Sequence, residues 1–431
     1  MKKAFIWLLS AALLCALALA VSAADAVAYV SDAGSDTAAG TSDAAPLKTL
    51  AAAYDPVGKG GTVVVCGPLT LSGNALHLPQ SSGTVTITSV FGGTDYTKQG
   101  GAVLNLGGYT YLGGDTVFEN IKINDSSSFY FNQLICGGHN LTIGNGVVCT
   151  KDSGEYITIL GGMYINSNSM TAADVSFYDY TITVNSGLWY GVYGSNKRTS
   201  NESAMGATGN VSIIINGGSF TGKAANQADA MIAVGGFASQ DGDYYLEING
   251  GIFNCPIYGI ARPGQSSGRY TAYYDGDVKI VINGGELRGA TVSTVQSETA
   301  SYIGGNYALE IAGANFTALS SIAAPRVRGT ATCEVEIMRV APTLEMEPIT
   351  YCHSCGRSSR SSTRARACWS PPAPCGTCCT RRRSRARTGG SGACARGRRR
   401  ASCTSGTPSP PSRGSTPTPA SGASRGSPAP G

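Results

Sequence analysis

Apolar and polar residues alternate in five short segments of the chain between residues 177 and 316. In each segment the first, third and fifth positions are apolar, and most of the positions between them are polar. A period of two with one apolar face predicts a β-strand that packs one side against a core. The five predicted strands are residues 180–184, 211–215, 244–248, 278–282 and 307–311.

A similar turn follows each predicted strand, and the copies are spaced by 31, 33, 34 and 29 residues. Internal repeats of this length indicate a solenoid, in which equivalent residues of successive coils stack in columns. Four of the strands are followed directly by an asparagine, and the fifth by Ala312. Stacked amides can hydrogen-bond along the solenoid axis, which predicts a structural ladder. Its members are Asn185, Asn216, Asn249 and Asn283.

The N-terminal half carries a looser version of the same pattern, without helical periodicity. Short strands that pair in parallel with their counterparts about 4.8 Å away are the economical solution for such repeats. We therefore predict an all-β, single-stranded parallel β-helix of roughly ten coils. The further predicted strands are residues 62–65, 84–88, 102–106, 116–123, 140–143 and 156–160.

The first 23 residues differ from the rest of the chain. Lys2 and Lys3 precede an apolar run at residues 4–20 and the small residues Val21-Ser22-Ala23. This order is typical of a secretory signal peptide, and the run is too short for a permanent membrane span. We expect an exported, extracellular protein with no membrane span.

The composition changes abruptly near residue 350. Residues 1–351 hold 17 Lys and Arg and 27 Asp and Glu, a net charge of −10, whereas residues 352–431 hold 15 Arg and no acid, so the sum is +5. The tail also lacks Ile, Leu, Val, Met, Phe and Tyr, so it cannot bury a core. We predict a disordered Arg/Ser/Pro/Cys-rich tail, and its residue types suggest a frameshift product. The acidic body argues against a nucleic-acid partner.

Eight of the 14 cysteines lie in this tail, in groups such as Cys352-His353-Ser354-Cys355, whose spacing would suggest zinc in another context. A basic arm of this kind could also attach to an anionic wall polymer. The sequence predicts four regions: a signal peptide at 1–23, an N-terminal cap at 24–60, a parallel β-helix at 61–345, and the tail at 346–431.

The start of the mature chain resembles that of secreted bacterial right-handed parallel β-helix proteins of the pectate-lyase-like superfamily. The resemblance rests on Tyr29-Val30-Ser31, Gly34-Ser35-Asp36, Gly40-Thr41, Pro46-Leu47-Lys48-Thr49-Leu50 and the strand that begins at Gly60. It implies that residues 47–54 form a short amphipathic helix that caps the core. It covers about residues 27 to 340 and is specific for the fold rather than for the chemistry.

Acidic residues precede the strands of two consecutive coils. The carboxylates of Asp241, Asp243, Asp275 and Asp277 would meet across one coil spacing and could hold Ca²⁺, although no cofactor is required. Alternatively, these Asp-Gly segments are ordinary turn formers whose side chains lie in water.

Two long connections bring aromatic and basic residues together. Such groups bind sugar rings and uronate carboxylates; alternatively, these loops only fold back on their coil. The substrate-binding candidates are Trp189, Tyr190, Tyr193, Tyr258, Tyr270, Tyr273 and Tyr274. By resemblance to polysaccharide lyases of this fold, Arg262 or Arg269 could act as the catalytic base.

The sequence motifs of the enzymes on this fold are missing. Trp189 is followed by Tyr190 rather than by the Trp-x-Asp-His run of classical pectate lyases, and His139 stands alone between two strands, as a turn residue. We therefore expect a monomeric, secreted scaffold that binds extracellular polysaccharide. Such a scaffold could be the N-terminal module of a larger carbohydrate-active protein. The alternatives are a Ca²⁺-dependent polysaccharide lyase, which we favour over a glycoside hydrolase, and a structural or adhesive repeat protein.

Overall fold

The structure is a computed structural model, which describes residues 26–72, 75–126, 133–151, 157–165, 179–198, 209–221, 231–235, 241–261, 272–295, 301–317, 321–322, 333–337 and 365–369. The predicted signal peptide and most of the tail lie outside these residues. The chain divides into two compact units, Met1–Arg382 and Arg383–Gly431, and every described residue belongs to the first.

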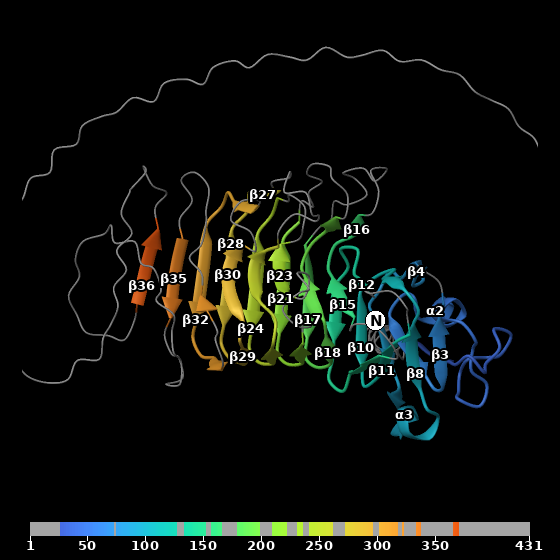
Figure 1. Cartoon of the computed structure of the whole chain (residues 1–431). Helices are drawn as coiled ribbons and strands as arrows, with labels where there is room; N and C mark the ends of the chain where they lie inside the picture. Colours follow the sequence, from blue (N-terminus) through green and yellow to red (C-terminus); the bar gives the residue numbers. More distant parts are fainter. Residues whose placement is uncertain are drawn as a thin grey trace, which may run out of the picture. The chain divides into compact units, whose positions relative to one another are not determined.

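The described part is all-β, with mostly parallel strands in stacked sheets and two helices (Figure 1). The chain passes repeatedly through the same series of sheets, and we call one such passage a coil. This arrangement is consistent with a β-solenoid. The 9-stranded sheet receives one strand from each of nine coils, close to the ten expected.

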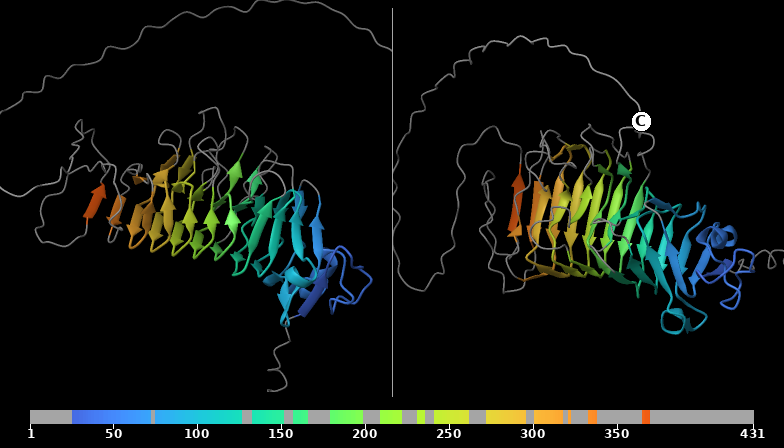
Figure 2. Two further views of the ribbon diagram at one scale, coloured as in Figure 1. Left: turned by 60° about the horizontal axis from the view of Figure 1, so that its bottom comes forward. Right: turned by 45° about the vertical axis from the view of Figure 1, so that its right-hand side comes forward.

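The largest sheet has 12 strands, which lie side by side in each view (Figure 2). They are β1 (Ala26–Val30), β2 (Gly61–Val65), β5 (Val85–Thr88), β10 (Thr116–Glu119), β13 (Leu141–Ile143), β17 (Tyr180–Val184), β21 (Val211–Ile215), β24 (Tyr244–Ile248), β28 (Val278–Ile282), β32 (Tyr307–Ile311), β35 (Cys333–Ile337) and β36 (Ala365–Trp369). The five strands predicted from the repeat are confirmed with the predicted bounds.

Three smaller sheets complete the coils. The 9-stranded sheet contains β4 (Ala75–His77), β9 (Tyr109–Tyr111), β12 (Gln133–Ile135), β15 (Thr158–Leu160), β19 (Gly191–Tyr193), β23 (Ile232–Gly235), β26 (Ile257–Ile260), β30 (Thr291–Val295) and β34 (Ser321–Ile322). The 4-stranded sheet contains β3 (Pro68–Leu71), β8 (Val103–Leu106), β11 (Lys122–Asp125) and β14 (Val148–Lys151). The 5-stranded sheet contains β18 (Leu188–Trp189), β22 (Ser219–Phe220), β25 (Ile252–Phe253), β29 (Glu286–Arg288) and β33 (Asn315–Thr317).

Three strand pairs lie beside these sheets. β16 (Tyr164–Ile165) pairs with β20 (Lys197–Arg198), and β27 (Ala272–Tyr274) pairs with β31 (Ser301–Ile303), both in parallel. β6 (Val90–Phe91) and β7 (Thr94–Asp95) form an antiparallel pair.

The core is one continuous cluster of inward-facing side chains. In β17, β21, β24 and β32 every second residue is buried, as the alternating sequence predicts. One inward column alternates between tyrosine and valine, so each large side chain has small neighbours in the adjacent coils, which allows dense packing. Its members are Tyr180, Val211, Tyr244, Val278 and Tyr307.

Two of the predicted elements differ from the structure. The predicted strand 116–123 is divided into β10 and β11, because Asn120 adopts a left-handed backbone (φ 47°) that turns the chain into the next sheet. The predicted capping helix 47–54 begins later, as α2 (Leu50–Val57). Leu47 instead forms a bridge with Val30 that covers the edge of β1, and Thr49 caps the helix by accepting a hydrogen bond from the Ala52 N–H.

The helix α2 packs on β1 and β2, the first two strands of the 12-stranded sheet. Its buried residues are Leu50, Ala53, Tyr54 and Val57, spaced by three or four positions on one helix face. Together with the bridge at Leu47, the helix covers the edge of the sheet that would otherwise offer unpaired backbone groups.

At the other end of the same sheet, β36 pairs antiparallel with β35. These five residues belong to the predicted tail, and the structure describes them as a strand. An edge strand needs only main-chain hydrogen bonds to pair, and these do not depend on the apolar residues that the tail lacks.

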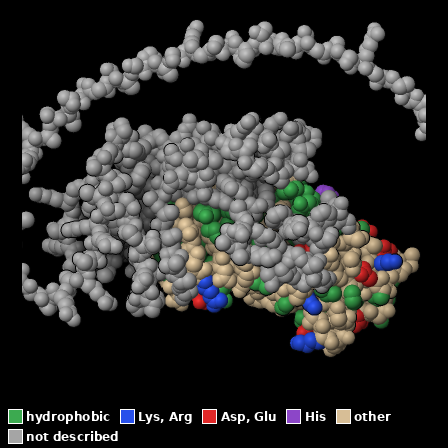
Figure 3. Space-filling model, in the orientation of Figure 1, with side chains coloured by type: hydrophobic (Ala, Val, Ile, Leu, Met, Phe, Trp, Pro, Cys, Tyr) green, Lys and Arg blue, Asp and Glu red, His purple; other side chains and the backbone are tan. Residues whose placement is uncertain are grey.

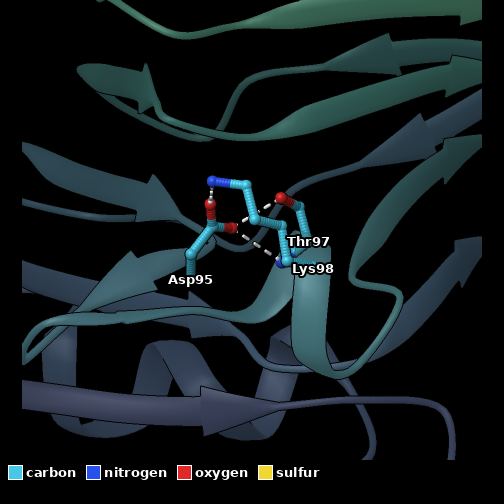
Figure 4. Close-up of polar contacts among 3 residues, drawn as sticks. All are labelled: Asp95, Thr97 and Lys98. Carbon is cyan, nitrogen blue, oxygen red and sulfur yellow. Dashed lines mark hydrogen bonds and ion pairs between the residues drawn. The ribbon is translucent and has the colours of Figure 1, made fainter.

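A short excursion from the 12-stranded sheet contains β6, β7 and α3 (Tyr96–Gln99). Asp95 organises it, because its Oδ1 accepts hydrogen bonds from the Thr97 N–H (3.1 Å) and hydroxyl, while Oδ2 pairs with Lys98 Nζ at 2.7 Å (Figure 4). The bonds from Lys98 and then Thr97 lower the pKa of the Asp95 carboxyl below its ordinary value.

We predict that replacing Asp95 by Ala destabilises this excursion in a pH-dependent way. Because the folded-state pKa is lowered, the stabilisation is complete above the unfolded-state pKa and is lost as the pH falls through the folded-state pKa. The difference in free energy of unfolding between wild type and Asp95→Ala, measured by denaturant titration, should therefore shrink on acidification. A difference that does not change with pH would contradict this role.

The stacked phenylalanines of the 5-stranded sheet test the core packing. Phe220 and Phe253 are fully buried, with ring centroids 5.0 Å apart and an interplanar angle of 7°. We expect Phe253→Ala to lower the free energy of unfolding by about 3–5 kcal/mol, measured by equilibrium denaturation. Phe253→Leu is the matched control. It should lower the free energy of unfolding by less than Phe253→Ala, because Leu287 already occupies the same column in the next coil. Equal losses in both variants would contradict this packing.

Candidate functional site

Four aromatic side chains gather on the outer side of the first strands of the 9-stranded sheet. We call His77, Tyr109, Tyr111 and Tyr164 the aromatic platform. Tyr109 and Tyr111 flank the buried Thr110 of β9, so they point away from the core, and both are partly exposed. Figure 3 shows hydrophobic side chains, tyrosine included, at the surface next to a histidine.

The platform consists of two ring pairs. His77 of β4 is the register partner of Tyr111, and their rings stack with centroids 4.6 Å apart and an interplanar angle of 12°. The ring of Tyr109 lies 4.8 Å from that of Tyr164, tilted by 32°. Offset and tilted ring pairs at such distances attract each other, so the two rings of each pair stabilise one another.

The platform continues an apolar column on the outer side of the sheet. Each member is the register partner of the next, in the order Tyr111, Ile135, Leu160, Tyr193, Ala233 and Tyr258. These residues form a second hydrophobic cluster, separate from the core. The column is buried from Ile135 to Ala233 and partly exposed at its two ends, Tyr111 and Tyr258.

Partial burial changes the chemistry of these phenols. Burial, and to a lesser extent the neighbouring Tyr109, raises the pKa of Tyr111 above its ordinary value. Burial also raises the pKa of Tyr258. Both hydroxyls therefore stay protonated and neutral well above physiological pH, so they can donate hydrogen bonds.

Several of the predicted substrate-binding residues are buried. Trp189 belongs to the core, is 0% exposed and donates a hydrogen bond from Nε1 to the Ser186 carbonyl at 2.9 Å. Tyr190, Tyr193 and Tyr274 are also buried. A side chain without exposed surface cannot offer its ring face to a ligand in this conformation. Of this predicted set, Tyr258 is the partly exposed member whose side chain the structure describes.

The remaining candidates lie outside the described residues. They are Arg262, Arg269 and Tyr270; for Tyr273 only the backbone, in β27, is described. The two candidate catalytic arginines therefore stay predictions.

Two of the four predicted calcium ligands accept hydrogen bonds from the backbone. Asp243 Oδ1 accepts a hydrogen bond from the Asp277 N–H at 2.9 Å, and Asp277 Oδ1 accepts one from the Asn306 N–H at 2.7 Å. All four carboxylate residues, which include Asp241 and Asp275, are exposed. Among the residues that the structure describes, no group of three His, Cys, Asp or Glu could hold a metal ion. The assignment of these four carboxylates to calcium therefore stays a prediction.

The same acceptor role recurs along one corner of the coils. The Asp or Asn that precedes a strand of the 12-stranded sheet accepts the backbone N–H of its counterpart in the next coil. Asp115 does so for Asn140, Asp179 for Asn210, and Asn210 for Asp243. The turn interpretation of these residues therefore matches their hydrogen bonds, with the addition that their side chains join neighbouring coils.

The predicted asparagine ladder forms at the opposite end of these strands. Asn216 Nδ2 donates to Asn185 Oδ1 at 2.8 Å, Asn249 Nδ2 donates to Asn216 Oδ1 at 2.9 Å, and Asn283 Nδ2 donates to Asn249 Oδ1 at 2.9 Å. The last three asparagines are exposed, so the ladder runs along the surface.

The aromatic platform was not among the sites predicted from the sequence. β9 has three residues and was not among the predicted strands. The signal was the run Tyr109-Thr110-Tyr111, in which two aromatic residues alternate with a small polar one, as on the outer face of a strand. The contact with Tyr164 depends on a connection between coils and has no local signal.

Comparisons with protein-family models, curated proteins and solved structures found no match for this chain. The class of protein is therefore defined by the structure alone: an all-β protein of stacked, mostly parallel strands, consistent with a β-solenoid, with a partly exposed aromatic platform on one sheet. Among the described residues, no helix is long and apolar enough to cross a membrane.

We predict that Asn249→Ala weakens the ladder at two points, because Asn249 both donates to Asn216 and accepts from Asn283. The expected loss in free energy of unfolding is about 1–2 kcal/mol, the contribution of two exposed hydrogen bonds. Asn254→Ala is the control, since the exposed Asn254 side chain makes no ladder bond. Equal stability of the two variants in denaturant titrations would contradict the structural role of the ladder.

Proposed function

We propose that this protein is an extracellular β-helix scaffold that binds polysaccharide through the aromatic platform. The observation that carries the proposal is the pair of partly exposed ring contacts, His77 with Tyr111 and Tyr109 with Tyr164. Export is supported by the signal-peptide pattern at residues 1–23.

The chemistry of the platform suits a sugar. Pyranose rings present an apolar C–H face and a rim of hydroxyls, so they bind surfaces that combine aromatic rings with hydrogen-bonding groups. The platform offers three phenol rings and an imidazole, each with a polar atom at its edge. A mainly charged ligand would instead need fixed cations beside the rings.

The platform is also positioned before the ligand arrives. All four of its residues lie on strands β4, β9 and β16, and β4 and β9 are bonded to each other in register. A surface whose side chains are already held by mutual stacking loses little conformational entropy on binding, and this favours affinity.

For the finer class of fold, we propose a right-handed parallel β-helix of the pectate-lyase-like kind. The support is the coil length near 30 residues, the mostly parallel sheets and the capping helix α2. Parallel connections within a sheet are right-handed in nearly all proteins, which supports the proposed hand. We propose no catalytic step. Among the described residues, no candidate base lies beside a group of side chains that could hold a metal ion.

The proposal is tested by measuring the affinity of the protein for a panel of neutral and acidic polysaccharides, by affinity electrophoresis or calorimetry. We expect Tyr111→Ala and Tyr164→Ala each to weaken binding about tenfold, because each removes a ring face worth about 1 kcal/mol or somewhat more. Tyr111→Phe keeps the ring and should retain most of the affinity.

Tyr245→Ala is the control for a tyrosine elsewhere on the surface, since Tyr245 lies on β24 and donates its hydroxyl to Glu247 at 2.8 Å. Circular dichroism confirms that each variant is folded. Absence of binding to every polysaccharide, or equal affinity in the platform variants and the control, would reject the proposed function.

A further inference from the structure

Four asparagines of the chain are followed directly by glycine: Asn145, Asn216, Asn249 and Asn283. Such pairs deamidate spontaneously, since glycine has no side chain to hinder attack by its own nitrogen on the asparagine carboxamide. The reaction is one of the reasons why asparagine is a thermolabile residue. It needs water and a mildly basic solution but no enzyme.

Deamidation of an Asn-Gly pair passes through a cyclic imide. The glycine backbone nitrogen gives its proton to solvent base and forms a bond to Asn Cγ, and the Cγ–Nδ2 bond breaks with loss of ammonia, which leaves a succinimide. Water then opens either C–N bond of the ring and gives aspartate or isoaspartate. The reaction therefore needs a glycine nitrogen that is free to reach Cγ and a carboxamide that is free to turn toward it.

In the ladder, both groups are held by the preceding coil. The Gly217 N–H donates to the Val184 carbonyl at 3.3 Å, while Asn216 Nδ2 donates to Asn185 Oδ1 at 2.8 Å. The other two ladder pairs repeat this arrangement, with bonds from Gly250 N–H to Ile215 O at 3.4 Å and from Gly284 N–H to Ile248 O at 3.2 Å.

The stacking of the coils also explains why glycine recurs at these positions. A Cβ at Gly217 would lie 2.3 Å from the Asn185 carbonyl oxygen, and a Cβ at Gly284 would lie 2.4 Å from that of Asn249. The fold therefore requires a reactive Asn-Gly pair in each of these coils and, by the same contacts, holds its reacting groups apart.

Asn145 is in a different position. It lies in the exposed turn after β13, and neither its carboxamide nor the Gly146 N–H takes part in a hydrogen bond within the described structure. Gly146 has a left-handed backbone (φ 69°). Only the Asn145 carbonyl is held, by the Asn120 N–H at 2.9 Å, and this bond leaves both reacting groups free.

We propose that Asn145 is the deamidation site of the folded protein, whereas the three ladder asparagines that precede glycine react only when their coil opens. The reaction at Asn145 adds a negative charge to an exposed turn. In the ladder it would replace an amide donor by a carboxylate that has no hydrogen to give to the preceding asparagine, so an opened coil could not re-form the same bonds.

The test is peptide mass spectrometry of the full-length chain during incubation at mildly alkaline pH, with and without guanidinium chloride. In the folded protein we expect Asn145 to convert about 100-fold faster than any ladder asparagine, the factor given by a local opening free energy of about 2.7 kcal/mol. In denaturant the four rates should agree within a few-fold, because every site is an Asn-Gly pair.

Asn145→Gln is the matched variant. It should abolish the fast conversion in the folded protein and leave the ladder rates unchanged, because a glutamine would have to close a larger ring. Ladder asparagines that react as fast as Asn145 in the folded protein would overturn the proposal, as would an Asn145 rate that rises on unfolding as much as theirs.

Discussion

The structure depends on one constraint, the in-register parallel pairing of successive coils. A coil can stack on the previous one only if equivalent residues meet at the strand spacing of about 4.8 Å. This condition places Tyr180, Val211 and Tyr244 in one inward column, where large and small side chains alternate. It also requires glycine at Gly217 and Gly284, where a Cβ would meet the backbone of the preceding coil.

The constraint that orders the core also orders the surface. When inward residues align in columns, the outward residues of the same strands must align too, since side chains alternate along a strand. His77 therefore lies directly over Tyr111, and the apolar column continues from there to Tyr258. The proposed binding platform needs no special scaffold, because it is the exposed end of a column that the coil register has already formed.

The sequence predicted the parts of the fold that repeat and missed the parts that depend on a single contact. The strands at 180–184 and 307–311 and the asparagine ladder follow from periodicity, and the structure has them. The burial of Trp189 was missed although the repeat carries its signal, since Trp189 stands four residues after Asn185 and pairs in register with the buried Phe220. The platform was missed since its Tyr164 arrives from a connection between coils.

The most direct test of the account is hydrogen–deuterium exchange with and without a polysaccharide that the protein binds. The account predicts that the ligand slows exchange in peptides covering β4, β9 and β16, the strands that carry the platform, and leaves the exposed face of β24 and β28 unchanged. Slower exchange only in other parts of the chain, with no change at residues 109–111 and 164–165, would contradict the assignment of the platform as the binding site.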